Sequence, residues 1–139
     1  MFNFLGLKKR TNKIKILIVD DEPDLVQTLQ DRLEMNGYII VTASNGKEGL
    51  EKAAQEKPDI ILLDVIMPIM DGLEMLEALR KHPEVKNCAV IMLTARSQRQ
   101  DIVRAKTCGI EDYTVKPFDL SELIEKIENV LEQRRVVAR

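Results

Sequence analysis

The sequence predicts a doubly wound α/β fold, in which one sheet of parallel strands is covered by helices on both faces. Short apolar runs rich in Ile and Val alternate with longer segments whose apolar residues recur at helical spacing. The runs 16–19 and 60–63 are apolar throughout, which is typical of strands buried on both faces. With 139 residues, 45% of them hydrophobic, the chain is long enough to fill the core of a single domain.

Five strands are predicted, and a helical segment follows each of them. The strands cover residues 14–19, 38–43, 59–63, 89–93 and 111–115. The first helix has Pro23 at its first position, an apolar stripe from Leu25 to Leu33, and Asn36-Gly37 at its end. These are the residue types that favour the start, the buried face and the end of a helix.

The other four helices are bounded by similar signals. The second helix starts at Asn45-Gly46 and ends before Pro58, and the third has Leu73, Leu76 and Leu79 on one face and ends at His82-Pro83. The fourth covers residues 97–108 and is stopped by Gly109. The fifth starts at Asp119, which forms a capping-box-like pair with Glu122. Because parallel crossovers place helices above and below a sheet, the economical strand order is flavodoxin-like, 2-1-3-4-5. Ligands of such sheets bind outside the carboxyl ends of the strands.

Polar side chains follow four of the five predicted strands. Asp20-Asp21 follows the first strand, Asp64 the third, Thr94 the fourth and Lys116 the fifth. Either aspartate of the first pair could merely cap a helix, but three aspartates at one sheet edge repel each other unless a cation joins them. Carboxylate oxygens suit Mg²⁺, which commonly takes one or two carboxylates together with phosphate oxygens. The sequence therefore predicts a site for a divalent metal ion and a phosphoryl group.

Five motifs in this order resemble the receiver domain of bacterial two-component response regulators. The resemblance spans residues 13 to 133, and each motif falls at the expected strand end. The motifs are Asp20-Asp21, Asp64-Val-Ile-Met-Pro68, Asp71-Gly72, Thr94-Ala95, and Asp112-Tyr113 with Lys116-Pro117-Phe118.

The resemblance implies a role for each residue of the site. Asp64 is expected to be the nucleophile that accepts a phosphoryl group from a phosphohistidine on a sensor kinase. Thr94 and Lys116 are expected to contact that group. The peptide bond between Lys116 and the following Pro117 is expected to be cis. The expected Mg²⁺ site consists of Asp20, which orients metal-bound water, Asp21, Asp64 and the backbone carbonyl of Ile66.

The resemblance also implies a conformational switch. When the phosphoryl group draws Thr94 inward, the ring of Tyr113, which otherwise points outward, is expected to fill the vacated space. The surface formed by helix four, strand five and helix five would then change and control a partner protein. The candidate contacts on this surface are Arg99, Ile102, Lys106, Thr114 and Lys126.

Composition and charge limit the other functional classes. Every acidic residue lies between Asp20 and Glu132, so the body of the chain is acidic and is not expected to bind nucleic acid directly. No apolar run is long enough to span a membrane, and two cysteines without metal-ligand spacing fit a reducing cytoplasm. The expected organisation is a tail at 1–12, a receiver domain at 13–133 and a tail at 134–139, as a monomer or a phosphorylation-dependent dimer.

Three alternatives stay open beside the signalling module. The first is a phosphorelay intermediate that passes its phosphoryl group to a histidine phosphotransfer protein. The second is an aspartyl-phosphate hydrolase, which is disfavoured because Ile66 stands where that class needs a second aspartate. The third is a pseudo-receiver, which is disfavoured because the full acidic set is present. A receiver catalyses its own phosphorylation and dephosphorylation without being a conventional turnover enzyme, and an apolar Ile66 favours a persistent phosphoryl state.

Overall fold

The computed structural model describes residues 13–138 and contains one parallel sheet of five strands. The strands lie in the order β2-β1-β3-β4-β5, as the sequence predicts. Their bounds are β1 Lys15–Val19, β2 Ile39–Ala43, β3 Ile60–Asp64, β4 Ala89–Ala95 and β5 Asp112–Lys116. The central strands are buried on both faces, since residues 16–19 and 60–63 have no exposed surface.

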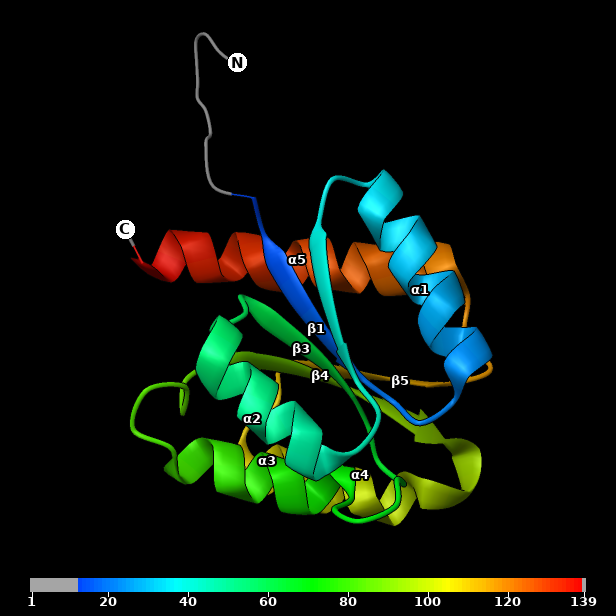
Figure 1. Ribbon diagram of the computed structural model, residues 1–139, viewed down its shortest axis with the longest axis vertical. Coiled ribbons are helices and arrows are strands. Elements are labelled where there is room, and N and C mark those ends of the chain that lie inside the picture. Colours follow the sequence, from blue (N-terminus) through cyan, green and yellow to red (C-terminus); the bar gives the residue numbers. More distant parts are fainter. Residues whose placement is uncertain (1–12, 139) are drawn as a thin grey trace, which may run out of the picture.

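Helices cover both faces of the sheet (Figure 1). Their bounds are α1 Pro23–Met35, α2 Gly46–Glu56, α3 Gly72–Lys81, α4 Arg99–Cys108 and α5 Leu120–Ala138, with a short 3-10 helix, η1, at Arg96–Gln98. Leu29 and Leu33 of α1 pack with Leu123 and Ile127 of α5 against one face. Helices α2, α3 and α4 pack against the other face. The alternating side chains of each strand therefore fill two separate cores.

The helix starts follow from local hydrogen bonds. Pro23 occupies the first turn of α1, and the Asn45 side chain accepts a hydrogen bond from the Glu48 N–H at 2.9 Å. The Asp119 carboxylate accepts the Ser121 N–H at 2.8 Å at the start of α5. The predicted helix starts are confirmed, but the reciprocal capping box expected of Asp119 and Glu122 is formed by Asp71 and Glu74 at the start of α3.

The largest differences from the sequence-based expectation lie at the junction of β4 and α4 and at the end of α5, and the bounds of the other strands agree within one residue. Strand β4 continues to Ala95, and α4 is preceded by η1, because the Gln98 side chain accepts the Ala95 N–H at 3.0 Å. Helix α5 continues to Ala138, whereas a tail is predicted from residue 134. The helix is held there because Arg134 donates to the Asn87 carbonyl and pairs with Glu111, contacts between distant segments that no local pattern reveals. The predicted tail at 1–12 lies outside the described residues.

Close backbone contacts fix the loop between β3 and α3. The Gly72 N–H donates to the Val65 carbonyl at 2.7 Å, and the Gly46 N–H donates to the Met70 carbonyl at 2.8 Å. A Cβ atom at Gly72 would lie only 2.0 Å from the Asp64 carbonyl oxygen. Glycine at position 72 therefore lets the loop pack directly against the backbone of Asp64.

Candidate functional site

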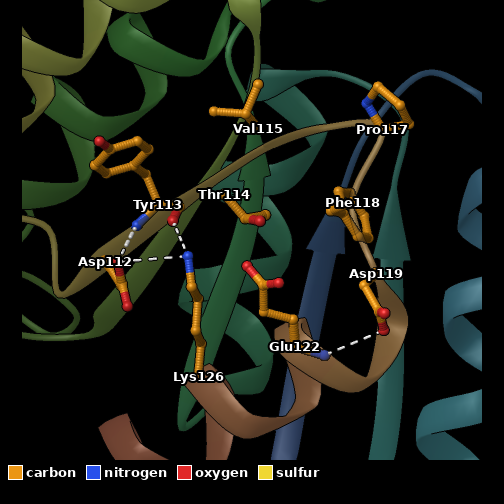
Figure 2. A pocket seen from close by; sticks show the side chains of 9 residues that line it. All are labelled: Asp112, Tyr113, Thr114, Val115, Pro117, Phe118, Asp119, Glu122 and Lys126. Carbon is orange, nitrogen blue, oxygen red and sulfur yellow. Dashed lines mark hydrogen bonds and ion pairs between the residues drawn. The ribbon is translucent and has the colours of Figure 1, made fainter.

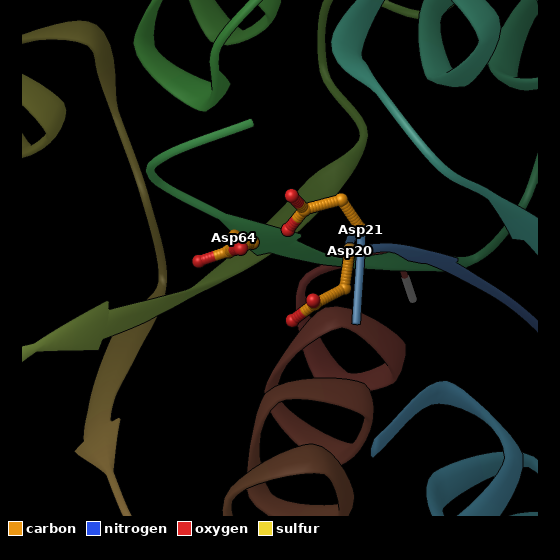
Figure 3. A group of neighbouring side chains, drawn as sticks. All are labelled: Asp20, Asp21 and Asp64. Atoms are coloured by element: carbon orange, nitrogen blue, oxygen red, sulfur yellow. The ribbon is translucent and has the colours of Figure 1, made fainter. Parts of the chain in front are cut away.

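Three aspartates from two strand ends lie together at the carboxyl edge of the sheet (Figure 3). One carboxylate oxygen from each of Asp20, Asp21 and Asp64 lies within 4.8 Å of the other two. Asp20 follows β1, and its N–H donates to the Ala43 carbonyl at 3.1 Å, while Asp64 is the last residue of β3. Asp20 and Asp64 are buried and Asp21 is exposed. The grouping predicted from the strand ends is thus present.

Lys116 reaches this cluster from the end of β5. Its Nζ atom lies 2.9 Å from Asp20 Oδ2, 2.6 Å from Glu22 Oε1 and 3.4 Å from Asp64 Oδ1. The Lys116–Pro117 bond is cis, as the resemblance implies. Glu22 was not expected at the site, although its place directly after Asp20-Asp21 at the strand end is a signal that could have indicated it.

The electrostatics of the cluster are unfavourable for a fully charged Asp64. Burial, followed by repulsion from Asp20, raises the pKa of Asp64 from 3.8 to about 7, although Lys116 acts in the opposite direction. Burial alone would lower the pKa of Lys116, but the hydrogen bonds that Lys116 donates to Glu22 and Asp20 outweigh it and raise that pKa. One ammonium group therefore leaves carboxylate charge uncompensated.

The donor set fits a hard divalent cation. Carboxylate oxygens at this spacing match the ligands of Mg²⁺, and a 2+ charge would relieve the repulsion that raises the pKa of Asp64. Asp20, Asp21 and Asp64 are the side chains that could hold it. Ile66 lies two residues after Asp64, and its side chain is 59% exposed. Its carbonyl as a fourth ligand stays a prediction.

Thr94 is buried at the end of β4, next to the site. Its hydroxyl is held within its own segment, because its nearest acceptors are the Ala95 carbonyl at 3.1 Å and Gln98 Oε1 at 3.5 Å. Sequence reasoning missed Gln98, since a polar residue at the start of a helix carries no signal that its side chain turns back to the preceding strand.

Tyr113 of β5 is half-buried and packs beside the core under α2, α3 and α4. The Nζ atoms of Lys106 on α4 and Lys126 on α5 lie 5.4 and 5.9 Å from the centre of its ring, within range of cation–π attraction. Lys126 also donates to the Tyr113 backbone carbonyl at 2.6 Å. The ring is thus held between two lysines from different helices.

The predicted contact surface needs correction at two positions. Ile102 and Thr114 are buried: Ile102 belongs to the core under α2, α3 and α4, and Thr114 is 3% exposed in β5. Arg99 and Lys106 are exposed. Val103, which the sequence analysis did not single out, is 67% exposed on α4 and adds an apolar side chain to this face.

The family model described as the response regulator receiver domain matches residues 16–128. The chain belongs to this family. Receiver domains bind Mg²⁺ at an acidic pocket and have histidine kinases as partners. The aspartate cluster has the position and composition of such a pocket.

The chain is also similar in sequence to known transcriptional regulators. The chain is 41% identical over 124 residues to the alkaline phosphatase synthesis transcriptional regulatory protein PhoP of Bacillus subtilis, covering 89% of this chain and 51% of that protein. It is 42% identical over 126 residues to the probable transcriptional regulator ycf27 of Guillardia theta, covering 91% and 48%. The chain thus spans about half the length of the curated relatives it matches.

Solved structures agree with the fold. A CheY-like response regulator receiver domain protein from Methanospirillum hungatei is 31% identical and superposes with a TM-score of 0.84, covering 89% of this chain and 98% of that one. The chemotaxis response regulator CheY4 of Vibrio cholerae is 33% identical, with a TM-score of 0.80 and coverage of 86% and 99%. Within residues 13–138, no helix has the length and hydropathy of a membrane-spanning segment.

Proposed function

We propose that this receiver accepts a phosphoryl group on Asp64 from a sensor histidine kinase in the cytoplasm, with Mg²⁺ held by Asp20, Asp21, Asp64 and the Ile66 carbonyl. The observation that carries the proposal is the meeting of three carboxylates and Lys116 at one sheet edge. Such a cluster costs folding free energy unless positive charge is added, so it is better explained by chemistry than by stability.

The residues of the site divide the work of phosphoryl transfer. Asp64 supplies the attacking carboxylate oxygen, which forms a bond to phosphorus as the bond to the donor nitrogen breaks. Lys116 lies 3.4 Å from Asp64 and is positioned to pair with an oxygen of the incoming group. A bound divalent ion supplies charge neutralisation for the oxygens of that group. Asp20 keeps Lys116 oriented through its 2.9 Å contact.

The proposed output is a change of the surface formed by α4, β5 and α5. A hollow of about 370 Å³ lies on this surface, lined by residues of β5 and the start of α5 (Figure 2). Tyr113 and Lys126 border it. If Thr94 moves toward the phosphoryl group, Tyr113 can follow inward, which takes its ring away from Lys106 and Lys126 while Lys126 keeps its hydrogen bond to the Tyr113 carbonyl. A protein partner would read that change.

The proposal is tested by labelling the chain with acetyl phosphate and Mg²⁺. We expect a phosphoryl label that survives acid and is lost in base, as an acyl phosphate should be. Asp64→Asn should abolish it, whereas Asp24→Asn, a change at an exposed position of α1, should leave it intact. Label retained by Asp64→Asn would contradict the assignment.

The phosphorelay alternative differs in where the group goes next. A labelled chain that transfers its group to a histidine phosphotransfer protein, with no partner recognising the changed surface, would favour that role. The relatives named as transcriptional regulators are about twice as long as this chain. We propose that the receiver domain acts on a protein segment or partner and does not itself contact nucleic acid, because every acidic residue of the chain lies within it.

A further inference from the structure

Gln98 ties together the two hydrogen-bond donors at the end of β4. Its side-chain oxygen accepts the Ala95 N–H at 3.0 Å and lies 3.5 Å from the Thr94 hydroxyl, which also has the Ala95 carbonyl as an acceptor at 3.1 Å. Gln98 is the last residue of η1 and is half-buried. A single side chain thus connects the strand end, its two donors and the start of α4.

These donors lie on β4, the strand between β3, which carries Asp64, and β5, which carries Lys116. In the strand register, Asp64 of β3 is opposite Leu93, the residue before Thr94. On the other side of β4, Ala95 is opposite Lys116 of β5. Thr94 and Ala95 therefore end the strand that separates Asp64 from Lys116, beside the place where a phosphoryl group on Asp64 would lie.

We propose that Gln98 is a positioning residue that holds Thr94 and Ala95 in the unphosphorylated arrangement by supplying the acceptor that the phosphoryl group later supplies. The inference rests on the proposed function of Asp64. The amide oxygen of Gln98 is a neutral acceptor, whereas the phosphoryl group carries charged oxygens whose hydrogen bonds are stronger. The donors therefore leave Gln98 when Asp64 is phosphorylated.

The exchange links the site to α4. Release of the Ala95 N–H removes the hydrogen bond that encloses η1, because Gln98 and Ala95 are the two ends of that turn. Helix α4 begins at the next residue, Arg99, and carries Lys106 over the Tyr113 ring. The hydrogen bonds to Gln98 must therefore break before Thr94 and the start of α4 can move, and their strength reduces the net free energy of binding the phosphoryl group.

Two substitutions change the acceptor in opposite directions. Gln98→Met keeps the length of the side chain and removes the acceptor, whereas Gln98→Glu strengthens it with a charge. Gln100→Met is the matched control, because Gln100 is exposed two residues later on α4. Beryllofluoride with Mg²⁺ serves as the phosphoryl mimic, and amide resonances of ¹⁵N-labelled protein report its binding.

We expect Gln98→Met to lower the half-saturating beryllofluoride concentration by about three- to tenfold, the effect of one hydrogen bond. Gln98→Glu should raise it, and Gln100→Met should leave it unchanged. In protein without metal or beryllofluoride, Gln98→Met should also speed hydrogen exchange of the Ala95 amide. In Gln98→Glu the Ala95 amide should exchange as slowly as in the wild type, which would support the role of residue 98 as a hydrogen-bond acceptor.

Equal or weaker binding of beryllofluoride by Gln98→Met would overturn the inference, and so would an Ala95 amide that exchanges at the wild-type rate. Neither result would affect the assignment of Asp64 as long as the wild-type chain binds the mimic. Failure of the wild-type chain to bind beryllofluoride at Asp64 would refute the proposed function and, with it, the role of Gln98.

Discussion

The two edges of the sheet use buried charge in opposite ways. At the amino edge, the Arg80 guanidinium of α3 donates to the backbone carbonyls of Lys86 at 2.9 Å, Cys88 at 2.7 Å and Gly109 at 3.1 Å. At the carboxyl edge, one ammonium group, that of Lys116, faces three aspartates and Glu22. At the amino edge, backbone carbonyl dipoles stabilise the positive charge of Arg80. At the carboxyl edge, negatively charged carboxylates face each other.

The difference separates residues that stabilise the fold from residues that await a ligand. A cation surrounded by carbonyl oxygens joins loops that are far apart in the sequence and contributes to stability. Clustered carboxylates lower the stability of the folded protein, and binding of a cation or a proton to them restores it. Removal of the Arg80 charge at one edge and of the Asp64 charge at the other should therefore change the free energy of unfolding with opposite signs.

The largest expected loss comes from the backbone contact beneath the site. Gly72→Ala should lower the free energy of unfolding by about 4 kcal/mol, because the new Cβ would overlap the Asp64 carbonyl oxygen at 2.0 Å. Gly37→Ala is the control, since nothing lies within 4 Å of its Cβ position and only its φ of +93° opposes the change, at about 1 kcal/mol. Urea unfolding measures both, and equal losses would show that the contact relaxes freely.

The next effect tests the amino edge. Arg80→Met should lower the free energy of unfolding by about 3 kcal/mol, because three carbonyl groups lose their donor. Arg104→Met removes an exposed arginine whose 3.4 Å contact with Glu77 is largely solvated, and should cost no more than about 0.5 kcal/mol. If the two variants unfold at the same urea concentration, the amino edge is not a stabilising network.

A gain is expected at the carboxyl edge. Asp64→Asn should raise the free energy of unfolding above pH 7 by about 2 kcal/mol, because it removes a buried carboxylate that other carboxylates repel. The folded-state pKa of Asp64 lies above the unfolded value, so the cost accumulates between about pH 4 and pH 7. The advantage of the variant should therefore disappear as the pH falls toward 4. A pH-independent difference would contradict this cause.

The smallest effect concerns the metal. Mg²⁺ at ten times its dissociation constant should stabilise the wild-type chain by about 1.4 kcal/mol, and EDTA should reverse the change. The variant Asp21→Asn should gain less, since it lacks one of the three clustered carboxylates. Thermal unfolding in the presence of Ca²⁺ or Mg²⁺ would show whether the stabilisation depends on the ion. Equal gains for wild type and variant would exclude this cluster as the site.

The site could be predicted from sequence where strand ends determine it. Asp20, Asp64 and Lys116 each directly follow or end a strand, and parallel strands bring those ends together. The long-range side-chain contacts could not be predicted in the same way. Arg80 and Gln98 bind backbone groups whose positions depend on the finished fold, and neither residue stands out by type or spacing.

The fold was predictable to a similar extent, and its errors share that origin. Apolar runs located four of the five strands, the exception being β5 with its sequence Asp-Tyr-Thr-Val-Lys, and caps such as Asn45 and Asp119 located helix starts. The end of α5 was missed because the contact of Arg134 with Glu111 joins positions far apart in the chain. The predicted exposure of Thr114 was wrong because the other four residues of the edge strand β5 are only partly buried, and the sequence does not show that Thr114 alone is covered.

The hydrogen bond from Lys126 to the Tyr113 carbonyl fastens the main chain of β5 to α5 at the residue whose ring is expected to rotate. Rotation about χ1 leaves that bond in place, so the ring can change position while the strand and the helix axis stay still. Methods that follow overall shape or helix content would then miss the event. Aromatic resonances of Tyr113, one of two tyrosines in the chain, would report it directly.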